Sequence, residues 1–238
     1  MLTDFHSHIL PGVDDGSAGV EESIAMLRME AEQGINCVVA TPHFYARYDD
    51  PRRFLQRRAA AEEQLREAME DQCGLPQVLT GAEVHYFTGM SDSDDLRQLT
   101  IGGKRGILIE MPPAPWTDGM YRELAQVHEK QGLTPVIAHI DRYITPFHTY
   151  GILSRLEEMP VLVQANASFF LKRGTAPFAL RLLRQGKIHL LGSDCHNLTD
   201  RAPNLGIALG AIRKRLGGEA LDWLERHENV VLPLDVLK

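Results

Sequence analysis

The stretch TDFHSHILPGVDDG (residues 3–16) places His6 and His8 at the end of a short apolar segment and follows them with the acidic pair Asp14 and Asp15. Residues that alternate along a strand point to one face, so the two imidazoles are predicted to face the same space. With 10 histidines in 238 residues, such a pair also arises by chance. Whether it marks a metal site depends on what the rest of the chain places beside it.

Short apolar segments like the first one return along the chain, and amphipathic segments lie between them. Several are continuous and rich in β-branched residues, which is typical of strands buried on both faces of a parallel sheet. The predicted strands are 2–5, 36–41, 77–84, 105–111, 134–139, 160–166 and 187–194. The predicted helices are 17–34, with Ser17 as its N-cap, 51–74, 117–132, 175–186 and 204–217.

This alternation of seven strands with helices predicts an α/β protein with a parallel sheet, either a closed barrel or a doubly wound sheet. No linker-like segment or change of composition divides the chain, so residues 1–238 are predicted to form a single domain. In a parallel barrel the C-terminal ends of the strands meet at one rim, where active sites lie. The polar residues that follow the strands are therefore predicted to face one another.

Histidines and acidic residues follow nearly every predicted strand. A single histidine at a strand end is more often a packed core residue, but repetition at successive strands favours a metal site. Imidazoles and carboxylates without thiolates suit Mn, Fe or Zn ions, and this set is large enough for two or three ions. The candidate ligands are His6, His8, Asp15 (or Asp14), His43, Glu83, Glu110, His139, Asp194 and His196, with Asn166 at the remaining strand end.

Two arginines lie shortly after candidate ligands. Arg142 follows His139 in HIDRY, and Arg201 follows His196 in HNLTDR. The planar guanidinium matches a phosphate bidentately, so both are predicted to bind a phosphoryl group. The alternative is an ion pair with the adjacent Asp141 or Asp200.

Composition excludes several classes of protein. A formal charge of −7 and a pI near 5.8 argue against a binder that neutralises nucleic-acid phosphates broadly. Three widely spaced cysteines do not form a disulfide framework. The segment MLTDFHSH has no basic stretch leading into an apolar run, so we expect no signal peptide. No apolar run approaches the ~20 residues that span a bilayer. We expect a cytoplasmic protein without membrane insertion; a homo-oligomer is left open.

The motifs HSHILPGVDDG, TPHF, GAEVHY, LIEMP, AHIDRY and GSDCHN, in this order, resemble the PHP (polymerase and histidinol phosphatase) superfamily. Within it, they resemble the metal-dependent bacterial protein-tyrosine phosphatases of capsule and exopolysaccharide biosynthesis loci. The resemblance covers nearly the whole chain. It implies a distorted (β/α)7 TIM-like barrel with a metal site at the C-terminal ends of the strands.

The resemblance also implies roles for individual residues. Arg142, Arg201 and Asp15 would be catalytic, and manganese is the expected metal, with iron or zinc as alternatives. The substrate would be phosphotyrosine on the tail of a capsule-assembly tyrosine autokinase. The implied metal positions are His6, His8, Glu83 and Asp194; Glu83, Glu110 and His139; and Asp15, His43 and His196. Asp14 is an alternative to Asp15.

Cys195 to Arg201 also fits C-x5-R, the minimal signature of cysteine-dependent tyrosine phosphatases. Such loops wrap phosphate with backbone N–H groups and lower the thiol pKa with positive potential. Here the segment contains no glycine, Asp200 lies within it and Asp194 precedes it. The preferred hypothesis is therefore hydrolysis by a metal-activated hydroxide.

Other functions compete with this hypothesis. A histidinol-phosphate phosphatase would share the metal site, and an amidohydrolase acting on C–N bonds is disfavoured by the paired arginines. A catalytically silent regulatory domain is disfavoured by the intact set of candidate ligands. The stretch HFYARYDDPRRFLQRR (43–58) is either a substrate-binding flank with aromatic and basic residues or a packed loop followed by a solvated helix.

Overall fold

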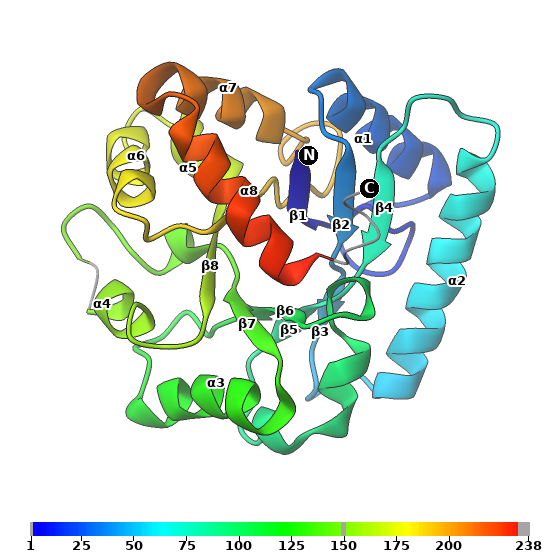
Figure 1. Ribbon diagram of the computed structural model, residues 1–238. Coiled ribbons are helices and arrows are strands. Elements are labelled where there is room, and N and C mark those ends of the chain that lie inside the picture. The colour runs from blue at the N-terminus through cyan, green and yellow to red at the C-terminus, as the bar shows by residue number, and fades with distance from the viewer. Residues whose placement is uncertain (1, 149–150, 233–238) are drawn as a thin grey trace.

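The computed structural model describes residues 2–148 and 151–232, and within them every pairing between strands is parallel. Helices surround the strands on the outside (Figure 1). The strands are β1 (Thr3–Ser7), β2 (Cys37–Ala40), β3 (His43–Phe44), β4 (Gln77–Thr80), β5 (Glu83–His85), β6 (Gly106–Glu110), β7 (Thr134–Ile137), β8 (Leu162–Asn166) and β9 (Leu190–Gly192).

Two of the predicted strands are bent rather than straight. β2 leads into β3, and β4 leads into β5, with two residues between the halves. The hydrogen-bond ladder continues across both bends, since Gly81 N–H donates to Ala40 O at 2.9 Å and Glu83 N–H donates to Pro42 O at 3.0 Å. With each bent pair taken as one strand, the sheet has the predicted seven strands.

The sheet closes on itself where β1 meets β9. Asp194 N–H donates to His6 O at 2.8 Å, and His8 N–H donates to Cys195 O at 2.9 Å. Ser7 and Cys195 form a parallel bridge at the same place. The architecture is therefore the closed barrel, and the doubly wound alternative is wrong.

Two hydrophobic layers hold the barrel together. One lies between the strands and the surrounding helices. The other fills the barrel interior with one large side chain from each of several strands, and Val231 and Leu232 at the end of the last helix close it. Its buried members are Phe5, Val39, Ile101, Leu108, Val136, Ala138, Leu190, Val231 and Leu232.

The helices confirm the predicted alternation but not every boundary. The helix predicted at 17–34 begins later, with Gly19 as its N-cap, and the Ser17 hydroxyl contacts that of Ser23 at 2.8 Å. The assignment of Ser17 as N-cap is therefore wrong. The helices are α1 (Val20–Glu32), α2 (Pro51–Met69), α3 (Asp118–Gln131), α4 (Ile152–Leu156), α5 (Ala167–Leu171), α6 (Ala176–Arg184), α7 (Leu205–Leu216) and α8 (Glu219–Val231). Of these, α4, α5 and α8 were not anticipated.

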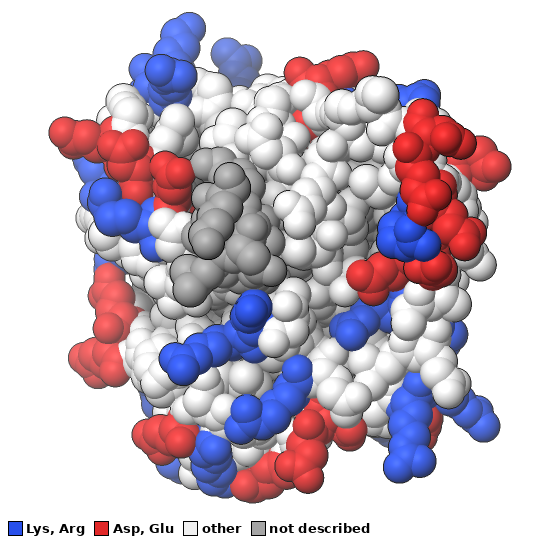
Figure 2. All heavy atoms as spheres, turned by 45° about the vertical axis from the view of Figure 1, so that its right-hand side comes forward, with Lys and Arg blue, Asp and Glu red and all other residues white. Residues whose placement is uncertain are grey.

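Charged side chains are distributed without a single dominant sign on the face that Figure 2 shows, where blue and red groups are interspersed around the edge. Along α2, Arg66 pairs with Glu63 at 2.7 Å. Such mixed charge does not provide the continuous basic surface of a general nucleic-acid binder on this face. In residues 2–148 and 151–232, no helix combines the length and apolar character needed to cross a bilayer.

Glu228 of α8 is a buried acid beside the closed end of the barrel. Its side chain is 8% exposed, and its Oε2 atom is buried without a hydrogen-bond partner among the described residues. Burial raises the pKa of Glu228 to about 7, so folding favours its protonated form. The unfolded chain releases this proton near the ordinary pKa of 4.5. This residue's contribution to stability is therefore present below pH 4.5 and is lost as the pH rises toward 7.

We expect Glu228→Gln to remove this loss, because glutamine fits the same site without a titrating proton. The difference in unfolding free energy between variant and wild type should shift in favour of the variant by roughly 1–3 kcal/mol between pH 5 and pH 8. Urea unfolding at the two pH values measures it. A constant difference would show that Glu228 does not titrate in this range.

Candidate metal centre

The strand order brings all nine candidate ligands to one rim of the barrel. His6 and His8 come from β1 and its end, His43 from β3, Glu83 from β5 and Glu110 from β6. Asp15 lies in the loop between β1 and α1, and the remaining candidates follow the ends of β7 and β9. His6, His8, Glu83, His139, Asp194 and His196 are buried, and contacts between the side chains connect the set.

The Glu83 carboxylate is the centre of this network. Its Oε2 lies 2.9 Å from His43 Nδ1 and 3.3 Å from His6 Nε2, and its Oε1 lies 2.8 Å from His139 Nε2. Burial alone would raise the pKa of Glu83, but the charge on His6 and the hydrogen bond from His139 hold that pKa well below its usual range. Glu83 therefore remains a carboxylate although it is 1% exposed.

Asp194 occupies the neighbouring position and also receives both arginines. Its Oδ1 lies 3.6 Å from His6 Nε2 and 3.5 Å from His8 Nε2. Arg201 donates to the same oxygen at 2.7 Å, and Arg142 donates to Oδ2 at 2.5 Å. The arginines thus pair with this rim carboxylate, and not with Asp141 or Asp200 as the alternative supposed.

Backbone strain coincides with the same part of the rim. Among described non-glycine residues, only His139 and Asp194 have positive φ, at 32° and 55°. Such conformations are costly for residues with a Cβ and cluster at functional sites. Both residues carry side chains that point into the network, so the strain orients candidate ligands.

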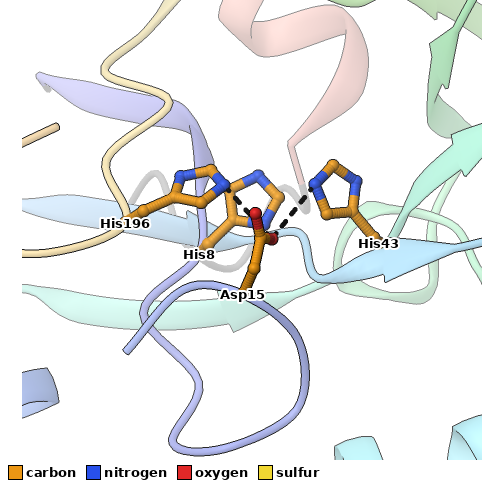
Figure 3. Close-up of side chains that lie close together, drawn as sticks. All are labelled: His8, Asp15, His43 and His196. Carbon is orange, nitrogen blue, oxygen red and sulfur yellow. Dashed lines mark ion pairs between the residues drawn. The ribbon is translucent and has the colours of Figure 1, made fainter. Parts of the chain in front are cut away.

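A further group of candidate ligands at the same rim contains His8, Asp15, His43 and His196 (Figure 3). The Asp15 carboxylate lies between two imidazoles, with Oδ1 3.5 Å from His43 Nε2 and 3.5 Å from His196 Nε2. Ligand atoms from these four residues lie within 4.8 Å of one another. Asp15 is 67% exposed and therefore stands at the mouth of the site.

Asp14 has a different role from its neighbour. Its Oδ2 lies 2.7 Å from His8 Nδ1 and accepts the His43 N–H at 2.9 Å. Burial would raise the pKa of Asp14, but the hydrogen bond with His8 lowers it below the ordinary range. Asp14 is thus an anion that orients His8 through the ring nitrogen facing away from the centre, as carboxylates do behind metal-binding histidines.

Unpartnered polar atoms indicate that the network fits cations. Glu83 Oε2, His43 Nδ1 and His196 Nε2 are buried without a hydrogen-bond partner among the described residues. His6 Nε2 and His8 Nε2 lie 3.1 Å apart, where a proton or a cation must separate the lone pairs. Nitrogen and carboxylate donors in this arrangement suit divalent transition ions.

A buried acidic pair supports the centre and was missed by sequence reasoning. Asp4 Oδ1 accepts the N–H groups of His6 at 3.0 Å and Ser193 at 2.9 Å, which joins the two segments that carry His6 and Asp194. Burial raises the pKa of Glu30 on α1 to about 10, and the adjacent Asp4 charge adds to this. Glu30 is therefore a neutral acid beside Asp4. The sequence feature that could have indicated this pair is Glu30, an acidic residue on the buried face of a helix.

The aromatic and basic stretch at 43–58 is partly a packed loop and helix and partly a flank of the site. Phe44 is a core residue that packs on Phe54, with ring centroids 5.1 Å apart. The Tyr45 ring lies 5.4 Å from that of His43 and thus borders the centre. Arg57 pairs with Asp49 at 3.0 Å, while Tyr48 is exposed. Only Tyr45 clearly belongs to the site.

Cys195 does not have the environment of a nucleophile. The side chain is fully buried, and burial together with the charge of Asp4 raises the thiol pKa well above its usual value. Reactive cysteines are partly exposed and have a lowered pKa. The C-x5-R match is thus not a cysteine phosphatase loop.

A profile of a family described as "Capsular polysaccharide synthesis, CpsB/CapC" matches residues 2–231. The chain belongs to the CpsB/CapC family. It is 30% identical over 240 residues to tyrosine-protein phosphatase YwqE of Bacillus subtilis (strain 168), covering 97% of this chain and 91% of YwqE. It is 28% identical over 234 residues to tyrosine-protein phosphatase CpsB of Streptococcus agalactiae serotype III (strain NEM316), covering 94% of each.

Solved structures agree with this family assignment. The CpsB/CapC chain superposes with a TM-score of 0.83 and 26% identity on a structure from work on YwqE from Bacillus subtilis and CpsB from Streptococcus pneumoniae, described as "unique metal-dependent tyrosine phosphatases". The match covers 97% of this chain and 94% of the other. A D-hydantoinase from Thermus sp., with a TM-score of 0.53 and 12% identity, shares the fold alone.

We expect Asp15→Asn to reduce bound metal by about one equivalent relative to wild type while leaving the melting temperature of the metal-free protein within ~2 °C, because Asp15 is an exposed candidate ligand without a core contact. Metal analysis after gel filtration and calorimetry measure the two effects. Asp92→Asn, at another exposed acid, is the matched control. Unchanged metal content in the Asp15 variant would remove it from the set of ligands.

Proposed function

We propose that the chain hydrolyses phosphotyrosine with two to three divalent ions held at the barrel rim, and that manganese is the expected ion, with iron or zinc as alternatives. Family membership and the relatives' names support a metal-dependent tyrosine phosphatase. The observation that carries the proposal is the joint presence of unpartnered buried ligand atoms and two arginines at one carboxylate.

We assign the ions to three adjoining positions within the contacts described above, and the first two of these positions share Glu83. The short distances from Glu83 and Asp194 to the surrounding imidazoles support this assignment. The proposed positions are His6, His8, Glu83 and Asp194; Glu83, Glu110 and His139; and Asp15, His43 and His196.

Divalent ions, when bound, lower the pKa of water toward neutrality and neutralise negative charge on phosphoryl oxygens. Arg142 and Arg201 supply guanidinium donors to those oxygens, and both are partly exposed at the mouth, with side chains 41% and 37% accessible. The Asp194 oxygens that they contact keep them near the centre before substrate arrives. The exposed Asp15 carboxylate completes the proposed catalytic set at the opening.

The tyrosine leaving group asks little of a general acid, because a phenol has a pKa of about 10. Tyr45 borders the site, but burial raises its pKa to about 12, which makes it a neutral hydrogen-bond donor and a poor acid. Departure of the tyrosyl oxygen therefore relies on charge neutralisation at the centre rather than on a dedicated side chain.

The biological setting is a further part of the proposal. The family description concerns capsular polysaccharide synthesis, so the proposed substrate is a phosphotyrosine tail of the tyrosine autokinase that serves capsule assembly in the cytoplasm. We also propose a single domain across residues 1–238. Closure of the barrel between its first and last strands supports it.

Removal of metal should abolish hydrolysis of a phosphotyrosine peptide. We expect a chelator to lower the rate more than about a hundredfold and manganese to restore it. Cys195→Ser should retain activity within about threefold, because the buried thiol does not contact substrate. A Cys195 variant that is inactive, combined with indifference to chelator, would contradict the metal mechanism. Turnover of histidinol phosphate alone would contradict the substrate assignment.

Loss of either arginine should weaken transition-state binding more than it weakens metal binding. We expect Arg142→Met and Arg201→Met each to lower kcat/KM for a phosphotyrosine peptide by about 10²–10³, with unchanged metal content. Arg57→Met, at an exposed pair remote from the rim contacts, is the control and should have no effect. If the rim variants also lost metal, the arginines would act through the ligands and not on phosphate.

A further inference from the structure

A cavity of about 330 Å³ lies beside the candidate metal centre. It is formed where the loop after β6 meets the segment after β7 and the start of α4. Its lining is mostly apolar and aromatic, and includes Ala114, Trp116, Tyr121, Arg142, Tyr143 and Ile152. The cavity is large enough for one bulky amino-acid side chain.

The aromatic wall of the cavity is held in place from outside. The Trp116 ring meets that of Tyr143 edge-on, with centroids 5.1 Å apart, and lies 5.7 Å from that of Tyr121. The Tyr143 hydroxyl accepts the Met111 N–H at 3.0 Å and donates to Met111 O at 2.8 Å. Arg155 stacks on Tyr121, 3.8 Å from its ring centroid. The cavity is thus preformed, which limits the entropy lost on binding.

Two consecutive residues connect this cavity to the metal centre. Arg142 lines the cavity and also donates to Asp194. The Tyr143 ring forms part of the cavity wall and lies 5.7 Å from the ring of His139. None of the nine candidate ligands is among the described residues that line the cavity. The cavity therefore adjoins the phosphoryl-binding position without containing it.

We propose that this cavity binds an apolar side chain of the substrate peptide, on a residue within two positions of the phosphotyrosine. The proposal rests on the proposed function, because it assumes a phosphotyrosine peptide at the centre. The phosphorylated ring is bonded through its oxygen to the phosphoryl group at the centre, whereas none of the candidate ligands is among the described residues that line the cavity, so we assign the cavity to a different side chain of the peptide. A neighbouring side chain can reach the cavity while the phosphoryl group stays at the centre, since residues two apart in an extended peptide are separated by about 7 Å.

The chemistry of the lining selects the class of side chain. Aromatic and proline side chains surround the cavity, and a leucine or phenylalanine buried there leaves water without stranding a polar group. Arg142 closes the side toward the centre, where it contacts phosphate. One arginine would thus couple recognition of the phosphoryl group with that of the adjacent residue.

The experiment fills the cavity without removing its wall. Ala114 is an exposed small residue of the lining, and Ala114→Phe should occupy the space. Ala59→Phe, at an exposed alanine of α2 outside this cavity, is the matched control. The substrates are p-nitrophenyl phosphate and phosphotyrosine peptides in which one position, from two before to two after the phosphotyrosine, is leucine and the others are glycine.

We expect the wild type and the Ala59 variant to prefer leucine over glycine at one position by about tenfold in kcat/KM. Ala114→Phe should abolish that preference while p-nitrophenyl phosphate turnover changes less than twofold. No preference in the wild type, or a preference that persists in Ala114→Phe, would overturn the proposal while leaving the phosphatase function intact. An equal loss on p-nitrophenyl phosphate would also overturn it, because the cavity would then receive the aryl ring. Wild-type protein inactive on every aryl phosphate would reject the proposed function itself.

Discussion

The buried carboxylate of Glu83 is the constraint on which the rest of the rim depends. A charge with 1% exposure must be compensated within a few ångströms, and here the compensation comes from imidazoles delivered by three other strands. Those strands can meet only if the sheet curls and closes. The bends between β2 and β3 and between β4 and β5, together with the backbone bonds between β1 and β9, are therefore part of the site as much as of the fold.

The same balance of charge explains why protons and cations compete for this centre. Burial would lower the pKa of His139, but hydrogen bonding to the Glu110 and Glu83 carboxylates outweighs it and raises that pKa to about 9. The pKa of His8 is likewise raised well above its usual value, chiefly by Asp14 against the effect of burial. A cation that takes these nitrogens must displace their protons. Without ions, the neighbouring carboxylates hold His8 and His139 charged; with ions, the same carboxylates would bind the ions or orient the imidazoles.

The positions of the candidate ligands could be predicted from the sequence because each candidate follows a local apolar run. Parallel strands end on one rim whatever their detailed register. The supporting residues could not be predicted in this way. Asp4 sits inside an apolar segment and acts through the backbone of His6 and Ser193, a contact made only on barrel closure. The sequence alone could not distinguish Asp14 from Asp15 as the candidate ligand, because their positions depend on the turn that ends at Gly16. This turn runs so close to β1 that a Cβ on Gly16 would lie 2.2 Å from His8 O. The packing of Val231 and Leu232 at the end of α8 against the barrel interior could not be predicted either, since their partners come from strands throughout the chain.

Under the proposed function, selectivity for a phosphomonoester would follow from the two arginines sharing Asp194. Each guanidinium already contacts one of its oxygens, and Asn166 also donates to Oδ2 at 2.9 Å. An incoming group must offer the arginines more than this carboxylate does, or present enough charge to be bound alongside it. A phosphate dianion with three free oxygens can do so through bidentate contacts, whereas a neutral amide cannot. A barrel can carry different chemistries, and in this proposal the residues on the loops after β7 and β9 would set which substrate charge the rim accepts.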